Sequence, residues 1–137
     1  MNNFKKVEYI ALGNKIQEVY NMAHTAHILA QYGYECITIS NDSYGPDFLA
    51  IHYGDFNVLK IQLKGRPTLA YKYYGKDIII AWIQEGQLWM INHDEIVDCD
   101  EFDGAGTSTY LANGYHWRND GIPKWLLKKI TKLTLEI

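Results

Sequence analysis

The chain has 137 residues, of which 47% are hydrophobic and 14% aromatic, and its formal net charge at pH 7 is −3. This composition excludes a disordered chain, and the apolar runs are too short to cross a bilayer, so we expect one globular domain over residues 1–137 with no membrane span. The first residues lack the unbroken apolar stretch of a secretion signal, which favours the cytoplasm. The negative net charge argues against bulk attraction to nucleic acid, so any nucleic-acid-binding surface has to come from local clusters of Lys and Arg.

The cysteines and histidines do not indicate a structural metal site. Cys36 and Cys99 lie far apart in the sequence and follow no C-x-x-C spacing, so we expect two free thiols. His24 and His27 are three residues apart on a predicted helix, but no second pair or carboxylate spacing completes a set of ligands. We therefore interpret both histidines as core or surface residues of that helix.

The first predicted element is a helix that runs from Asn14 to about Gln31. Asn14 is a plausible N-cap, Gln17 follows at the third helical position, and Gly33 provides the stop. Helical spacing predicts a buried stripe formed by Ile16, Val19, Tyr20, Ala23, His27 and Ala30.

A strand and an antiparallel hairpin follow this helix. Residues 35–40 alternate around Ile37 and Ile39 as in a strand, and the polar residues 41–46 predict a loop. Residues 48–52 and 58–64 have the composition of two strands, and a turn at residues 54–55 joins them into a hairpin.

The second half of the chain contains another predicted hairpin, formed by residues 77–83 and 87–92 with a turn at residues 85–86. Pro123 suits the first turn of a C-terminal helix whose apolar face would be formed by Trp125, Leu126, Ile130 and Leu133. Residues 98–118 match no regular pattern. The order of elements predicts an α/β protein of the mixed (α+β) kind, with a central β-sheet and flanking helices.

The strand at residues 58–64 carries the most informative pattern of the sequence. Its side chains alternate, so Leu59, Ile61 and Leu63 form an apolar side, and Lys60, Gln62 and Lys64 form a polar one. If the hairpin pivots near Asp55, residue 47 lies opposite residue 63, and Asp47 reaches the space above Gln62 and Lys64.

These side chains are suited to metal-assisted chemistry. The carboxylate of Asp47, the amide oxygen of Gln62 and a main-chain carbonyl are hard oxygen ligands of the kind that Mg²⁺ prefers, with Mn²⁺ as a substitute. Lys64 can orient or deprotonate an attacking water and stabilise the charge that develops on a phosphoryl group. The simpler interpretation stays open: Asp47 caps a turn after Pro46, and Gln62 and Lys64 belong to a solvated strand face.

The run Gly45-Pro46-Asp47, a strand, a turn and Gln62-Leu63-Lys64 resembles the motif of the PD-(D/E)xK nuclease superfamily. The resemblance covers about residues 14–66. It is strongest to the small bacterial and intron-homing endonucleases in which Gln replaces the second acidic residue. It implies a restriction-endonuclease-like core with Asp47 as the principal metal ligand, Gln62 as the second ligand and Lys64 as the catalytic lysine.

The exchange of an acid for Gln62 removes one negative charge from the metal site, so another carboxylate has to compensate. Glu18 on the first helix is the candidate third metal ligand, although it precedes Gly33 by about one turn more than the family pattern suggests. Three basic residues near the motif, Arg66, Lys60 and Lys72, are candidate contacts to DNA phosphates. Tyr71, Tyr73 and Tyr74, interleaved with Lys72 and Lys76, are further candidates to touch the nucleic-acid backbone.

The sequence thus predicts a Mg²⁺-dependent endonuclease that hydrolyses DNA phosphodiesters and works as a homodimer or higher assembly, since cutting both strands requires two sites. Two alternatives stay open. One is a catalytically inactive module on the same fold that binds DNA or a protein, which the acidic stretch 94–103 favours. The other is a metal-dependent phosphoesterase that acts on RNA or structured DNA.

Overall fold

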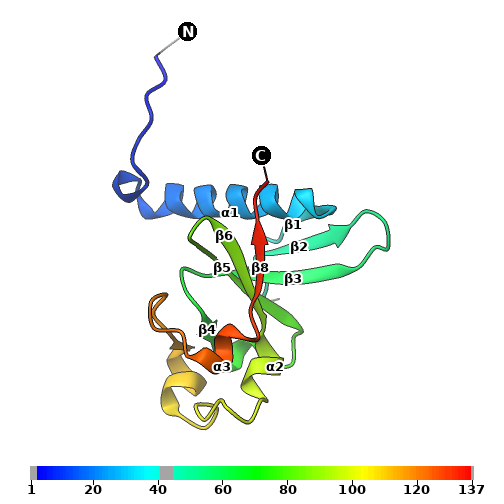
Figure 1. Cartoon of the computed structure of the whole chain (residues 1–137), viewed down its shortest axis with the longest axis vertical. Helices are drawn as coiled ribbons and strands as arrows, with labels where there is room; N and C mark the ends of the chain where they lie inside the picture. Colours follow the sequence, from blue (N-terminus) through cyan, green and yellow to red (C-terminus); the bar gives the residue numbers. More distant parts are fainter. Residues whose placement is uncertain (1–2, 41–44, 137) are drawn as a thin grey trace.

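A curled, six-stranded mixed sheet forms the centre of the molecule in the computed structural model, which describes residues 3–40 and 45–136 (Figure 1). The strands lie in the order β1-β2-β3-β5-β6-β8, and β4 and β7 pair separately. The mixed α/β class is therefore confirmed. The strands are β1 (Tyr34–Thr38), β2 (Phe48–His52), β3 (Val58–Leu63), β4 (Thr68–Leu69), β5 (Ile78–Gln84), β6 (Gln87–Asn92), β7 (Tyr115–His116) and β8 (Thr131–Thr134). The helices are α1 (Asn14–Gln31), α2 (His93–Val97) and α3 (Lys124–Leu127), with short turns η1 (Tyr9–Ala11), η3 (Tyr71–Tyr73) and η4 (Thr109–Asn113).

Helix α1 has the predicted length, but the predicted buried stripe is wrong. Ile16, Val19 and Tyr20 are about half exposed, at 52%, 54% and 52%, and Ala23, His27 and Ala30 are exposed as well. The buried residues of α1 are Thr25, Ile28 and Leu29, with Met22 packed beside them. Both stripes obey helical spacing, and the sheet lies against the one that the pattern did not favour. Asn14 is the first residue of α1, and Gly13 takes the N-cap position.

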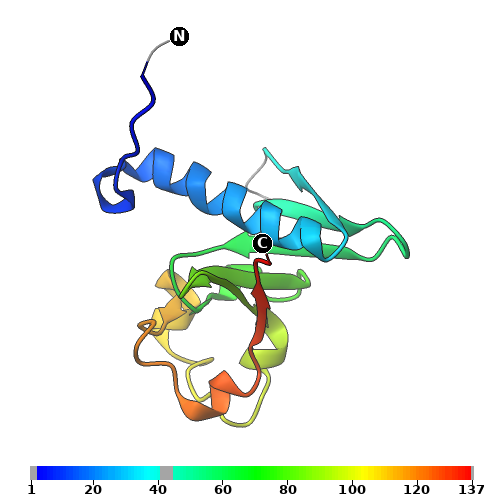
Figure 2. The same ribbon diagram turned by 45° about the horizontal axis from the view of Figure 1, so that its top comes forward.

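Both predicted hairpins are present. Strands β2 and β3 pair in antiparallel fashion. The turn that joins them reaches beyond the end of α1 (Figures 1 and 2). The register pairs Phe48 with Ile61, so Asp47 lies opposite Gln62 and not opposite Leu63 as predicted. The register differs because the turn has four residues, 53–56. The centre of such a turn lies between residues 54 and 55, whereas the predicted register assumed a centre on Asp55. Phe56 closes this turn with a left-handed φ of 59°. Of the predicted loop at residues 41–46, residues 41–44 lie outside the described part of the chain.

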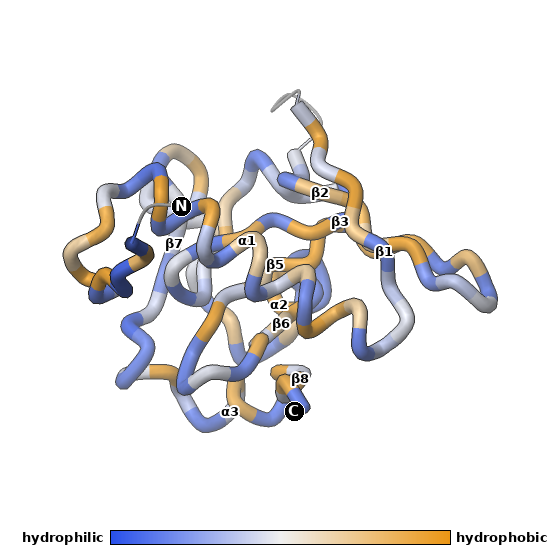
Figure 3. Tube along the Cα trace, turned by 90° about the horizontal axis from the view of Figure 1, so that it is seen from above, coloured by the Kyte–Doolittle hydropathy of each residue, from blue (hydrophilic) through white to orange (hydrophobic). Residues whose placement is uncertain are grey.

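Strand β3 continues the sheet by parallel pairing with β5, in which Ile61 lies beside Ile79 and Gln62 beside Ile80. β5 then pairs with β6 across the turn at residues 85–86. Neighbouring residues of β5 enter different cores: Ile80 belongs to the cluster opposite α1, and Ile79 packs against the cluster beneath α1. A hydrophobic segment runs along β5 in Figure 3, as expected for a strand whose two faces are both covered.

The predicted C-terminal helix is wrong beyond its first turn. Pro123 does open a helix, but α3 ends at Leu127, and Leu133 lies in strand β8, where it pairs with Leu88 of β6. Without β8, β6 would be an edge strand with unpaired backbone groups, and the β-branched Thr131 suits the strand that covers it.

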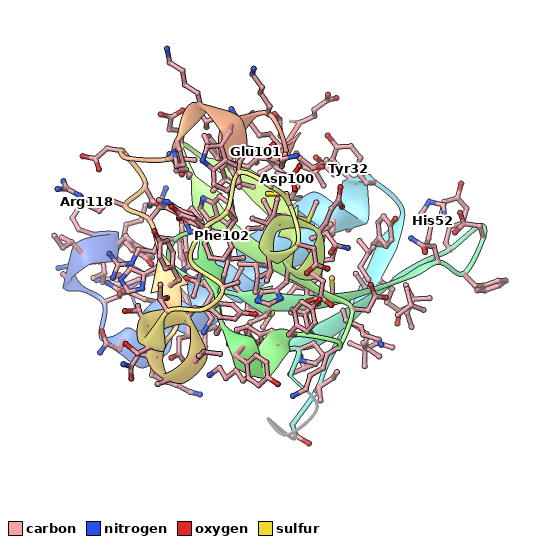
Figure 4. The ribbon with its side chains drawn as sticks, turned by 90° about the horizontal axis from the view of Figure 1, so that it is seen from below. Tyr32, His52, Asp100, Glu101, Phe102 and Arg118 are labelled. Atoms are coloured by element: carbon pink, nitrogen blue, oxygen red, sulfur yellow. The ribbon has the colours of Figure 1, made fainter. Side chains whose placement is uncertain are left out.

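The segment without a predicted pattern, residues 98–118, packs on the face of the sheet opposite α1. Phe102 and Tyr110 are buried in the same cluster as Trp82, and β7 pairs with β4. Figure 4 shows Phe102 within this packed side and His52 far from it, on the projecting hairpin. Cys36 and Cys99 are free thiols, as predicted. In the described part of the chain, no helix has the length and apolar content needed to span a membrane.

Candidate functional site

Asp47 and Gln62 are in direct contact where β2 begins and β3 ends. The Asp47 carboxylate oxygen Oδ2 accepts a hydrogen bond from the backbone N–H of Leu63 at 2.9 Å and another from the Gln62 side-chain amide at 3.1 Å. The backbone N–H of Asp47 donates to the carbonyl of Ile61 at 2.8 Å, which extends the ladder of β2 and β3 by one residue. The carboxylate is therefore held by the sheet itself, because both its backbone and its side chain bond to β3.

Lys64 is fixed at the backbone and half-buried at the side chain. Its N–H donates to the carbonyl of Ala81 on β5 at 2.8 Å, so it continues β3 beyond Leu63. Burial lowers the pKa of the Lys64 ammonium group, and the nearby Asp47 carboxylate opposes part of this effect. Its Nζ lies 5.3 Å from the centre of the Tyr73 ring. A lysine of this kind loses its proton more readily than an exposed one and remains close to a carboxylate.

A cavity of about 290 Å³ opens beside these residues, and we call it the cationic hollow. Besides Asp47, Gln62 and Lys64, its wall includes Lys72 and Lys76, and the buried Tyr73. The Lys72 ammonium lies 5.1 Å from the centre of the Tyr73 ring. Burial raises the pKa of the Tyr73 hydroxyl, although the positive charge of Lys72 counteracts this rise. The hollow thus presents three ammonium groups and one carboxylate, and suits an anionic ligand.

A second cavity, of about 680 Å³, shares the same wall and reaches α1; we call it the helix hollow. It brings Glu18 and Lys15 to the space that Asp47, Gln62 and Lys64 also line. The sheet-facing stripe of α1 explains this placement. Leu29, Thr25 and Met22 cover the sheet, and one and two turns further towards the N-terminus the same stripe carries Glu18 and Lys15, where the sheet has ended.

The structure brings together most but not all of the predicted site residues. Asp47, Gln62, Lys64 and Glu18 line the helix hollow, and Lys72 lines the cationic hollow. Lys60 and Arg66 are exposed and are not among the described residues that line either hollow. Their contact with DNA stays a prediction.

The side chains at the site offer the type of donor atom that a hard divalent cation prefers, but fewer charged ligands than such an ion usually has. The Asp47 and Glu18 carboxylates and the Gln62 amide all offer oxygen, the donor that Mg²⁺ prefers. Within residues 3–40 and 45–136, however, no three His, Cys, Asp or Glu side chains form a group that could hold a metal ion. The Gln62 amide also directs its nitrogen at Asp47, so it has to turn by half a rotation to present its oxygen. A metal would therefore rely on Gln62, on backbone carbonyls and on water.

Sequence reasoning missed Lys15 and Asn21, which also line the helix hollow. The signal was present: Lys15, Glu18, Met22, Thr25 and Leu29 form one continuous helical stripe that changes from polar to apolar. Once that stripe is assigned to the sheet, the polar end has to overhang the site.

No family model, no curated protein and no solved structure matches this chain. The likeness to the PD-(D/E)xK nucleases therefore depends on the residues described above.

Proposed function

We propose that this protein is a Mg²⁺-dependent endonuclease that hydrolyses phosphodiester bonds of DNA. The observation that carries the proposal is the contact of Asp47 with Gln62, beside a half-buried Lys64, on the wall shared by two polar hollows. The order of α1, β1 and the β2–β3 hairpin around these residues supports a restriction-endonuclease-like core.

Each residue has a role that its surroundings support. A bound Mg²⁺ would activate water and neutralise charge on the scissile phosphate. Asp47, Gln62 and Glu18, which all line the helix hollow, would hold it. Lys64 orients the attacking water, and because burial lowers the pKa of its ammonium group, it gives up its own proton more readily than an exposed lysine, which favours a part in deprotonating the water. Lys72 and Lys76 bind the phosphates next to the scissile bond, because they line the cationic hollow together with Asp47.

The test is cleavage of supercoiled plasmid and of a labelled duplex in Mg²⁺ or Mn²⁺, with EDTA as the metal-free reference. We expect cleavage by the wild type and a loss on the order of 10²–10⁴-fold in Lys64→Met, the range in which a positioned acid or base contributes. Asp47→Asn should lose at least as much, because it keeps the shape of the side chain but not its charge.

Lys128→Met is the matched control, since Lys128 is an exposed lysine just after α3 and lines neither hollow. It should keep cleavage within a few-fold of the wild type. Activity that survives both Asp47→Asn and Lys64→Met would contradict the proposal.

A catalytically inactive module that binds DNA or a protein is the second candidate. It is favoured by the lack of a three-carboxylate or histidine group in the described residues and by the amide nitrogen of Gln62 facing Asp47. Calorimetric titration with Mg²⁺ separates the two. Binding that disappears in Asp47→Asn supports the enzyme, whereas no binding by the wild type supports the module.

Two further parts of the proposal have their own tests. Cleavage of both strands requires two copies of the site, so we expect a homodimer or a larger assembly, which sedimentation velocity with and without DNA measures. Parallel assays with duplex DNA, single-stranded DNA and RNA of one sequence distinguish a deoxyribonuclease from a broader phosphoesterase.

A further inference from the structure

A third cavity adjoins the candidate site at Lys64, and neither Lys72 nor Lys76 lines it. Its volume is about 460 Å³, within the usual range of about 300–1,000 Å³ for ligand pockets. We call it the aromatic hollow. Lys64 lines it as well as the other two hollows, so the three hollows adjoin at this residue. The aromatic and amide side chains of its wall are those of Tyr9, Tyr20, Asn21, His24 and Asn119.

Aromatic rings on η1 and α1 dominate this hollow. The ring centres of Tyr9 and Tyr20 are 5.2 Å apart at an interplanar angle of 64°, and those of Tyr20 and His24 are 6.3 Å apart and nearly parallel, at 12°. Tyr9 is tied to α1, because its hydroxyl accepts from the Asn21 amide at 2.9 Å and its carbonyl accepts from the Gln17 amide at 3.0 Å. The wall is thus built before any ligand arrives.

The rings are held in place but not covered. Tyr9 is 42% and Tyr20 52% exposed, although both are large aromatic side chains. The polar contact of His24 is long, 3.4 Å from its Nε2 to the carbonyl of Gly86, at the turn between β5 and β6. Half-exposed aromatic rings beside amide groups are suited to a flat, polar heterocycle, which stacks on the rings and forms hydrogen bonds through its edge.

The cationic hollow and the aromatic hollow also differ in charge, and this difference favours the same kind of ligand in the aromatic hollow. The cationic hollow combines Lys64 with Lys72 and Lys76, whereas Lys64 is the one charged side chain among the described residues that line the aromatic hollow. Phosphates therefore favour the first hollow and bases the second. A base inside a duplex is already paired and stacked on both faces, so it can stack on Tyr20 only after it has left the helix.

From this arrangement we propose that the aromatic hollow binds one unpaired nucleobase adjacent to the scissile phosphate. The preferred substrate is then DNA with a local single-stranded nucleotide, such as a flap, a gap or a mismatch, and not a perfect duplex. This inference rests on the proposed nuclease function for the position of the scissile phosphate.

The test compares two Mg²⁺-dependent cleavage rates on substrates of one sequence: a perfect duplex and the same duplex with one unpaired nucleotide. The wild type should prefer the second, and Tyr20→Ala should reduce this preference on the order of 10- to 100-fold, the range associated with loss of one stacked base. Tyr20→Phe keeps the ring and should restore the preference. Tyr32→Ala is the matched control, since Tyr32 is a similarly exposed tyrosine (43%) just beyond the other end of α1. Figure 4 shows it across the molecule from Arg118, which precedes Asn119.

A binding measurement without cleavage separates this inference from the function. The fluorescence of 2-aminopurine at the unpaired position is quenched by stacking, and it is measured in EDTA. Quenching by the wild type and Tyr20→Phe but not by Tyr20→Ala supports the base site even if no cleavage occurs in Mg²⁺, in which case only the proposed function fails. Wild-type cleavage with equal rates on both substrates, or quenching unchanged in Tyr20→Ala, overturns the base site and leaves the nuclease proposal standing.

Discussion

The two hairpins of the central sheet have the same antiparallel topology and very different surroundings. In β5 and β6, residues on both faces are buried, with Trp82 and Ile80 on one side and Ala81 and Leu88 on the other. In β2 and β3, one face packs beneath α1 through residues such as Ile61, and the other stays accessible. The β2–β3 hairpin, which comes first in the sequence, therefore has a face that can hold polar functional residues. The β5–β6 hairpin lies between the two cores and packs against both.

The largest expected effect concerns the accessible hairpin. Lys64→Met should lower the cleavage rate on the order of 10²–10⁴-fold, because the group that orients and deprotonates water is gone. Its free energy of unfolding at pH 7 should stay equal or rise by up to about 1 kcal/mol, since the substitution removes a charge that burial disfavours. Urea unfolding beside the cleavage assay measures both. A large loss of stability would mean that this face is structural after all.

The next effect compares one leucine from each hairpin. Leu88→Ala in β6 should lower the free energy of unfolding by about 2–5 kcal/mol, because Leu88 is fully buried and its removal leaves a cavity. Leu59→Ala in β3 should cost less, about 1–2 kcal/mol, since Leu59 is only partly buried against the same cluster. Equal losses in urea unfolding would show that the two hairpins do not differ in packing as described.

Local signals were sufficient to predict both hairpins, because turns and alternating strands are encoded over a few residues. The same alternation placed Gln62 and Lys64 on one face, and the position of Asp47 before β2 brought it to them. The register was off by one residue because the composition of a turn does not determine how many residues it holds. The polar face of β3 was therefore predictable, but the exact partner of Asp47 was not.

Long-range contacts account for what the sequence did not reveal. Two stripes of α1 have helical spacing, and only packing on the sheet selects the one with Ile28 and Leu29. The spacing of Leu133 fits a helix, but its segment forms strand β8, which pairs with the otherwise open edge of β6. Because the exposed stripe was taken as the buried one, Tyr20 was assigned to the core, and its place in the aromatic hollow could not be foreseen.

A third prediction concerns His93, which follows β6 and is fully buried. Its Nε2 accepts from the backbone N–H of Ala70 at 3.0 Å, and its Nδ1 lies 2.8 Å from Asp94 Oδ1. Burial lowers the pKa of His93 below the ordinary value of 6.5, and the carboxylates of Asp94 and Asp98 oppose this effect.

The sign of the pH dependence follows from that shift. As the pH falls through 6.5, His93 of the unfolded chain binds a proton, whereas His93 of the folded protein stays neutral, so the free energy of unfolding decreases. Above this pH His93 is neutral in both states, and its contribution to stability is fully present. His93→Leu should cost about 1–3 kcal/mol at pH 7.5, because Ala70 loses its acceptor. The cost should shrink at pH 5.5, and His27→Leu, at an exposed site, is the control. A cost that grows on acidification would contradict the direction of the shift.

The smallest expected effect concerns the turns of the two hairpins, in which the hairpins should be alike. Phe56 and Glu85 both have left-handed φ angles, 59° and 54°, which side chains other than Gly, Asn and Asp adopt at a cost of about 1–2 kcal/mol. Phe56→Asn and Glu85→Asn should each raise the free energy of unfolding by up to about 1 kcal/mol. Thermal and urea unfolding measure the gain. If Glu85→Asn stabilises and Phe56→Asn does not, the ring of Phe56, 74% exposed in the single chain, makes a contact with a second copy in solution, and the tip of the projecting hairpin becomes the place to look for the dimer interface.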